Sequence, residues 1–305
     1  MQCKRKYSVV FAAALLCLTP LDAQSGWHYD FSPAGNFPGA YYSVPLGVSL
    51  DHIVGYYVAP SGVSAYVQTG DSFVDAAPPG AVTSYLYAIN SRGMAVGGYC
   101  PYGCTTEAGL SGYLYDSATG KTEPINFPMK DVATTAYGIN DSGVIVGGYC
   151  PMSLVCPQTS FTNHGFIDDH GVFTTLDFPN ALTTSLWGIN NAGAIVGYYQ
   201  LTASIAHAFV YQNGTFTTID FPRSFATLAL SINNLGAVAG LIQHLNTGED
   251  GFVYYDGHYT QIDKPNATAT VVTGINDRNE VIGLWYPILN EYAFKAIPVA
   301  PGGVP

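Results

Sequence analysis

The sequence repeats one motif six times, and this repeat limits the fold more than any other feature. The clearest copy is Gly188-Ile-Asn-Asn-Ala-Gly-Ala-Ile-Val-Gly-Tyr-Tyr199. Measured between the glycines that hold the position of Gly197, the copies are spaced 42, 50, 50, 43 and 43 residues apart. Repeats of this length build solenoids or propellers, in which each unit buries its apolar face against the next. The copies span residues 47–57, 88–99, 138–149, 188–199, 231–242 and 274–285.

Each repeat is expected to contain four short strands. The turn Asn213-Gly214 is a strong hairpin signal between two of them. Each repeat ends near a proline, which is excluded from central strands and marks the exit to the next repeat. Four antiparallel strands in each of six repeats predict an all-β, six-bladed β-propeller. In the clearest repeat the expected strands are 183–190, 194–199, 208–212 and 215–221.

The two ends of the chain support a closed ring. The last repeat has candidates for three strands only, and Trp27-His-Tyr-Asp-Phe31 resembles Phe216-Thr-Thr-Ile-Asp-Phe221. We therefore expect the N-terminal strand to complete the last blade and remove the open sheet edges. The predicted propeller spans residues 24–298, followed by a flexible Gly- and Pro-rich tail at 299–305.

The first 23 residues are typical of a secretory signal peptide. Lys4-Arg5-Lys6 precede an apolar run at 9–18 that is too short to span a membrane, and Ala23 is a suitable cleavage residue. The expected location is extracellular or periplasmic. Without this segment the formal charge would be −13. A chain this acidic lacks the basic surface that nucleic acids and anionic lipids require, and neither is expected as a partner. No membrane insertion is expected.

A second motif follows the first in each repeat. It is His207-Ala208-Phe209 in the clearest copy, with His164-Gly165-Phe166 and Asp250-Gly251-Phe252 as variants. Together the two motifs resemble the bacterial extracellular HAF-repeat family, over nearly the whole mature chain. The resemblance implies β-propeller-like repeats and an extracellular protein, and it implies no activity. Ser64, Ser111 and Tyr292 stand where the histidine would be.

Four cysteines remain after removal of the signal segment. Cys100 and Cys104 follow one strand, and Cys150 and Cys156 follow the equivalent strand of the next repeat. In a secreted chain, matched pairs of this kind indicate disulfides. We favour the local pairs, which close small loops, and Cys100 with Cys150 is the alternative. Zinc is disfavoured because the spacings are unusual for zinc ligands.

Polar residues that recur in every repeat are expected to serve the scaffold. An asparagine ends the first strand in five repeats and is expected to form a turn through its own backbone. Recurring acids near the fourth strand are expected to cap the following turn. The asparagines are Asn90, Asn140, Asn190, Asn233 and Asn276, and the acids are Asp30, Asp75, Asp177, Asp220 and Asp263.

The longer connections between strands place candidate binding residues on one face of the disc. Aromatic residues end the second strand of several repeats, and Tyr and Trp suit sugar rings or protein surfaces. The alternative is that they pack between blades. Two histidines interrupt the repeat on the same face. The candidate ligand-binding residues are Tyr57, Tyr99, Tyr149, Tyr199, Trp285, His164 and His207.

No catalytic motif is present in the sequence, and no catalytic residue is assigned. We expect a secreted, monomeric binding or surface-interaction module with carbohydrate or a protein as ligand. One alternative is a hydrolase or lactonase with its site in the central channel, with calcium as a possible cofactor. The neutral residues expected to line the channel do not favour metal chemistry. A structural matrix protein is the second alternative.

Overall fold

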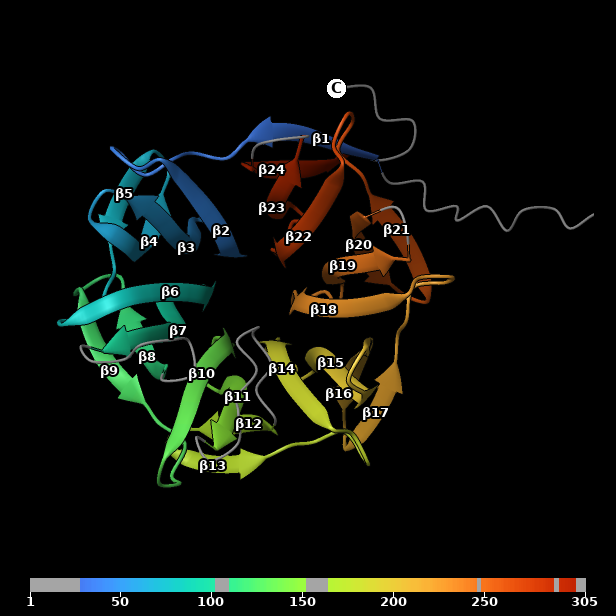
Figure 1. The fold of residues 1–305 in the computed structure, drawn as a ribbon, viewed down its shortest axis with the longest axis horizontal. Helices are drawn as coiled ribbons and strands as arrows, with labels where there is room; N and C mark the ends of the chain where they lie inside the picture. The colour runs from blue at the N-terminus through green and yellow to red at the C-terminus, as the bar shows by residue number, and fades with distance from the viewer. Residues whose placement is uncertain (1–27, 102–109, 152–163, 246–247, 288–290, 300–305) are drawn as a thin grey trace, which may run out of the picture.

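The fold is a ring of six four-stranded antiparallel sheets (Figure 1). The computed structural model describes residues 28–101, 110–151, 164–245, 248–287 and 291–299. In five blades the strands run in chain order from the centre to the rim, and in the sixth the outermost strand is the first strand of the chain. This arrangement is the predicted six-bladed β-propeller.

The blades are numbered here in chain order. Blade 1 contains β2 (Tyr42–Val48), β3 (His52–Ala59), β4 (Gly62–Thr69) and β5 (Ser72–Asp75). Blade 2 contains β6 (Ala81–Ile89), β7 (Met94–Pro101), β8 (Ser111–Asp116) and β9 (Lys121–Ile125). Blade 3 contains β10 (Val132–Ile139), β11 (Ile145–Pro151), β12 (His164–Asp169) and β13 (Val172–Thr175).

The remaining blades follow the same pattern. Blade 4 contains β14 (Thr183–Ile189), β15 (Ile195–Thr202), β16 (Ile205–Gln212) and β17 (Thr215–Thr218). Blade 5 contains β18 (Ala226–Ile232), β19 (Val238–His244), β20 (Gly248–Tyr255) and β21 (His258–Ile262). Blade 6 contains β22 (Ala269–Ile275), β23 (Val281–Tyr286), β24 (Tyr292–Val299) and, from the other end of the chain, β1 (His28–Pro33).

The repeated glycine is required by a β-bulge in the innermost strand. In blade 4 the pairing of β14 with β15 shifts between Leu186 and Gly188. A Cβ at Gly197 would lie 1.9 Å from the carbonyl oxygen of Ser185, so only glycine fits opposite the bulge. The same register shift occurs in all six blades. The motif therefore encodes the bend of each inner strand.

The bulged residues meet at the centre of the ring. The rings of Tyr137 and Trp187 stack with centroids 4.3 Å apart, and Tyr87 contacts both of them edge-on. These side chains come from β6, β10 and β14, the inner strands of three different blades. Aromatic side chains therefore occupy the middle of the channel on the side of blades 2 to 4.

The N-terminal strand closes blade 6 as predicted, but the register differs from the one that the sequence suggested. Pro33 pairs with Phe294 as Thr218 pairs with Phe209 in blade 4. Phe31 is thus the equivalent of Phe216, and Phe37, with one additional residue before it, is the equivalent of Phe221. The reason is that Phe37 is anchored to blade 1, where its N–H donates to Ser43 Oγ at 2.9 Å.

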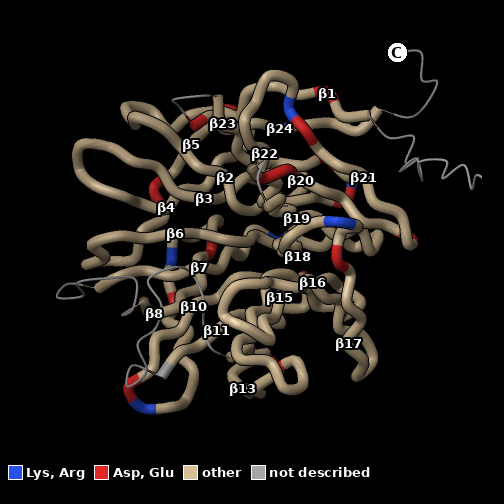
Figure 2. The backbone as a smooth tube through the Cα atoms, turned by 45° about the vertical axis from the view of Figure 1, so that its right-hand side comes forward, with Lys and Arg blue, Asp and Glu red and all other residues tan. Residues whose placement is uncertain are grey.

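Charged residues are few in this chain, and Figure 2 shows the Lys and Arg positions scattered over the ring rather than gathered in one place. The apolar core is divided into clusters of buried residues, and most of these clusters join two neighbouring blades. Stability therefore comes from blade-to-blade packing as much as from the sheets themselves.

Candidate functional site

A three-layer stack recurs at the blade boundaries. In blade 4 the ring of Phe178, from the connection leaving blade 3, lies parallel to Tyr199 at 3.5 Å. The imidazole of His207 stacks against Tyr199 at 5.3 Å. Blade 3 has the same order, with Phe127, Tyr149 and His164. Blade 1 keeps the first two layers, Phe37 and Tyr57, at 3.8 Å.

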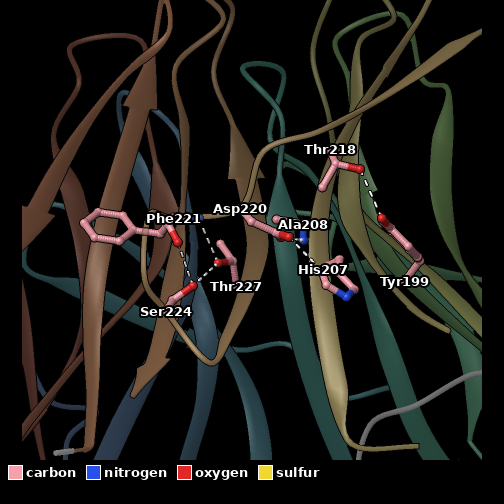
Figure 3. Close-up of polar contacts among 8 residues, drawn as sticks. All are labelled: Tyr199, His207, Ala208, Thr218, Asp220, Phe221, Ser224 and Thr227. Atoms are coloured by element: carbon pink, nitrogen blue, oxygen red, sulfur yellow. Dashed lines mark hydrogen bonds and ion pairs between the residues drawn. The ribbon is translucent and has the colours of Figure 1, made fainter. Parts of the chain in front are cut away.

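An aspartate holds the histidine layer in place (Figure 3). Asp220 contacts His207 Nδ1 at 2.6 Å and accepts the Ala208 N–H at 3.0 Å. Asp177 makes the equivalent contacts with His164 and the N–H of Gly165. These two acids therefore bind the third strand of their blades rather than capping the next turn.

Asp75 combines both roles in blade 1. It caps the turn by accepting the Ala77 N–H at 3.0 Å, as expected from the sequence. Its second oxygen accepts the hydroxyls of Tyr57 and Ser64. Asp75, Asp177 and Asp220 thus link neighbouring strands in their blades.

The tyrosines selected from the sequence lie mostly inside these stacks. Tyr57, Tyr149 and Tyr199 are 7%, 5% and 6% exposed. The Tyr199 hydroxyl contacts Thr218 Oγ1 at 3.0 Å. Tyr99 is half-buried and packs edge-on against Tyr113. Because these tyrosines belong to separate blades, the structure does not bring them together, and their surroundings favour packing between blades.

Blade 6 departs from this pattern at every layer. The N–H of Lys264 donates to Thr270 Oγ1 at 3.0 Å, just as that of Phe221 donates to Thr227. Lys264 therefore occupies the place of the stacking phenylalanine. Its Nζ lies 4.9 Å from the ring centroid of Trp285, within cation–π range. Tyr292 takes the place of the histidine and stacks on Trp285 at 5.1 Å.

A cavity of about 360 Å³ opens beside this modified stack, between blade 6 and blade 1. We call it the seam cavity. Tyr41 is 70% exposed and Tyr292 is 46% exposed, so aromatic surface faces solvent here. Residues 31–36 form one wall of the cavity, and the other lining residues include Tyr41, Tyr42, Lys264, Trp285, Glu291 and Tyr292.

Glu291 places a carboxylate in the seam cavity. Burial raises the pKa of this carboxyl, although a hydrogen bond from the Tyr286 hydroxyl, at 3.4 Å, opposes the shift. Burial, followed by the charge of Glu291, raises the pKa of Tyr286 to about 12. Glu291 is therefore a partly desolvated hydrogen-bond acceptor beside aromatic rings.

A second cavity, of about 320 Å³, lies on the other side of Lys264, between blades 5 and 6. We call it the rim cavity. It is lined by 28–31 and 261–265, and it shares Phe31 and Lys264 with the seam cavity. Lys264 therefore stands between two adjoining hollows.

Of the candidate ligand-binding residues chosen from the sequence, only Trp285 lines the seam cavity. The sequence does mark Lys264, because Asp263-Lys264-Pro265 has a lysine where Asp177-Phe178-Pro179 and Asp220-Phe221-Pro222 have a phenylalanine. Tyr41 and Tyr42 carry no such signal, since they precede a degenerate repeat.

The central channel ends in a small polar pocket on the opposite face, of about 80 Å³. A ring of hydrogen bonds surrounds it. The Asp141 N–H donates to Asn191 Oδ1 and the Asn191 N–H to Asn234 Oδ1, each at 2.8 Å. Within the described ranges no group of three or more His, Cys, Asp or Glu side chains is placed to hold a metal. Whether calcium binds stays a prediction.

The cysteines cannot be paired from the described residues. Cys100 and Cys150 are buried at the ends of β7 and β11, and neither is a free cysteine. Cys104 and Cys156 lie outside the described residues, as do the signal segment at 1–23 and residues 300–305. The local disulfides, the leader and the tail therefore stay predictions.

No protein-family model matches the sequence. No curated protein matches it either. The described part of the chain contains no helix with the length and apolar character needed to cross a membrane.

Several solved structures share the fold. AofleA from Arthrobotrys oligospora aligns with a TM-score of 0.52 at 12% identity, over 91% of each chain. A fucose-specific lectin from Aleuria aurantia aligns with a TM-score of 0.50 at 14% identity, over 88% of this chain and 99% of the lectin. TolB from Acinetobacter baumannii aligns with a TM-score of 0.53 at 11% identity, over 82% of this chain and 64% of TolB. At such low identities these similarities establish only that the chain has a β-propeller fold.

Proposed function

We propose that this protein is a carbohydrate-binding module and that the seam cavity is its ligand site. The observation that carries the proposal is the difference between blade 6 and the others. In the other stacks the middle tyrosine is buried, whereas in blade 6 Trp285 is half-buried and lies with Tyr292 and Tyr41 beside a cavity of about 360 Å³. A cavity of this size, lined by several aromatic side chains and a few polar groups, is typical of small-molecule sites.

The chemistry of the lining suits a sugar. Aromatic faces pack against the apolar C–H faces of a pyranose ring, and they leave its hydroxyls free for polar partners. Glu291 would accept hydrogen bonds from hydroxyls and Lys264 would donate them. The fucose-specific lectin from Aleuria aurantia supports the proposal, since it is a sugar-binding protein of similar fold.

The test is a titration of the mature protein with a panel of neutral and charged oligosaccharides, followed by calorimetry and by tryptophan fluorescence. We expect saturable binding that Tyr292→Ala and Trp285→Ala each weaken at least tenfold. Tyr255→Ala is the matched control, because Tyr255 is an exposed tyrosine, 54% accessible, beside a turn on the other face. The proposal is wrong if no saccharide binds, or if the control weakens binding as much as the site variants.

The same titration repeated with EDTA tests the calcium expectation. Binding that survives EDTA assigns recognition to the protein side chains alone, and binding that is lost requires a metal.

We also propose that the chain belongs to the HAF-repeat family and is secreted. The support is the six-fold motif and the role of its glycine beside each bulge, because that role explains why the motif recurs. N-terminal sequencing of the exported protein would test secretion, with cleavage after Ala23 expected.

A further inference from the structure

Lys264 is an isolated cation in an acidic protein. Its ammonium group lies 4.9 Å from the ring centroid of Trp285 and 5.4 Å from that of Phe31. Among the described residues no carboxylate forms an ion pair with it. Lys295, by contrast, is paired with Glu280 at 3.1 Å. The aromatic rings stabilise the charge of Lys264 without using its hydrogen-bonding capacity, which remains available to an oxyanion.

Lys264 stands at a position that is uncharged at the other blade boundaries, and it lines two cavities. In the equivalent place four other boundaries have Phe37, Phe127, Phe178 and Phe221. Where blade 2 begins the place is held by Pro78, whose carbonyl accepts the Ala81 N–H as that of Phe178 accepts the Ala181 N–H, so none of these residues carries a charge. Lys264 is half-buried and lines both the seam cavity and the rim cavity. A ligand that extends from one cavity to the other must therefore pass the ammonium group.

The carboxylates in the two cavities limit how much negative charge such a ligand can carry. Asp30 and Asp263 line the rim cavity, and Glu291 lines the seam cavity. Burial, followed by the charge of Asp250, raises the pKa of the Asp263 carboxyl. These groups accept hydrogen bonds from hydroxyls and repel anions. One anionic group at Lys264 is favoured, and further charges on both sides are disfavoured.

We propose that the seam and rim cavities together bind an acidic oligosaccharide in which one anionic group, a carboxylate or a sulfate ester, is bound by Lys264 and the units next to it are neutral. This inference rests on the proposed carbohydrate-binding function and specifies its ligand class. It distinguishes a sparsely charged saccharide from a neutral one and from a polyuronate with a charge on every ring.

The experiment compares four oligosaccharides by calorimetry on the mature protein. A hyaluronan tetrasaccharide carries a carboxylate on alternate rings, and its carboxyl-reduced form has the same linkages without charge. Tetragalacturonate carries a charge on every ring, and a keratan sulfate tetrasaccharide carries sulfate without carboxylate. We expect the hyaluronan or the keratan sulfate probe to bind at least tenfold more tightly than the reduced form and than tetragalacturonate. Which of the two binds identifies the oxyanion.

Lys264 is tested by substitution in the same assay. Lys264→Gln is expected to reduce binding of the acidic probe about tenfold and to weaken the reduced form much less, because the glutamine amide still donates a hydrogen bond, whereas Lys264→Arg is expected to keep the preference. Lys121→Gln removes an equal charge at a distant turn and serves as the control. Added salt should weaken the acidic probe in the wild type more than in Lys264→Gln.

The outcomes separate the two proposals. If neutral and acidic probes bind equally, or if Lys264→Gln keeps the preference, the ligand class is wrong and the carbohydrate site stands. If no probe and no other saccharide binds, both proposals are overturned. A melting temperature within a few degrees of wild type shows that the variant is folded.

Discussion

The side-chain amide of Asn190 donates a hydrogen bond to the main-chain carbonyl of Asn233 in the next blade, 3.2 Å away. The side-chain carbonyl of the same residue accepts the N–H groups of Ala192 and Ala194 in its own turn. Each recurring asparagine therefore shapes a turn and links two blades. The sequence predicted the first role, and only the ring arrangement reveals the second.

Loss of this link should destabilise the ring. Asn190→Ala removes three buried or partly buried hydrogen bonds and leaves the Asn233 carbonyl without its amide donor. We expect the free energy of unfolding to fall by about 2–4 kcal/mol, measured by urea denaturation. Asn126→Ala, at an exposed position, should change it by less than about 0.5 kcal/mol. Equal effects of the two substitutions would contradict the assigned role.

The series of side-chain amide hydrogen bonds that link one blade to the next is interrupted in blade 1. Ser49 holds the position of the asparagine and accepts the amide of Asn276 at 3.4 Å, but serine has no amide to pass on to Asn90. Ser49→Asn is expected to raise the free energy of unfolding by about 1 kcal/mol. Ser72→Asn, at the exposed first position of β5, is the control. A destabilised Ser49→Asn would mean that the Ser49 contact with the N–H of His52 matters more.

Closure by the N-terminal strand should contribute strongly to stability. Tyr29 in β1 is 7% exposed and packs into the core shared by blades 5 and 6, while His28 beside it is exposed. Tyr29→Ala should lower the free energy of unfolding by about 3 kcal/mol, and His28→Ala should have little effect. Similar melting curves for the two variants would argue that β1 is dispensable.

Replacement of Lys264 by phenylalanine should raise the stability of the protein and remove its preference for acidic saccharides. Lys264→Phe restores the residue type found in the Phe178–Tyr199 stack and should pack on Trp285. We expect a gain of about 0.5–1.5 kcal/mol in unfolding free energy together with loss of the preference for acidic saccharides. Thermal unfolding and calorimetry on one preparation measure both. A variant that keeps the acid preference would overturn the role given to the ammonium group.

The stability of blade 6 should depend on acid pH through Glu280. Burial raises the pKa of this carboxyl, but hydrogen bonds from Asn276, at 2.8 Å, and from Lys295 outweigh burial, and the net shift is downward from 4.5. A carboxyl with a lowered folded-state pKa stabilises the fold above its unfolded pKa and loses this contribution as pH falls below it.

Glu280→Gln tests this dependence. Unfolding free energies measured between pH 6 and pH 3 should fall less steeply in the variant than in the wild type, with the difference concentrated below about pH 4.5. Glu123→Gln, an exposed acid, should keep the wild-type slope. Parallel profiles for Glu280→Gln and the wild type would show that the Lys295 pair contributes nothing.

Much of the fold was predictable because its information is local. The period of the motif, turns such as Asn213-Gly214 and the missing fourth strand of the last repeat predict six blades and closure by the N-terminus, and β1 and β24 confirm it. Strand pairing between neighbours in sequence follows from alternation and turn type. The register of β1 did not follow, because it depends on Phe37 docking against blade 1.

The sequence by itself determined the repeat, the number of blades and the residues that break the pattern. The tertiary structure decided which aromatic residues face solvent. Tyr199 and Trp285 hold equivalent places in the motif, yet Phe178 covers one and Lys264 lies over the other. The covering residue comes from the connection that leaves the preceding blade, so the exposure of each ring depends on packing between blades that no single repeat encodes.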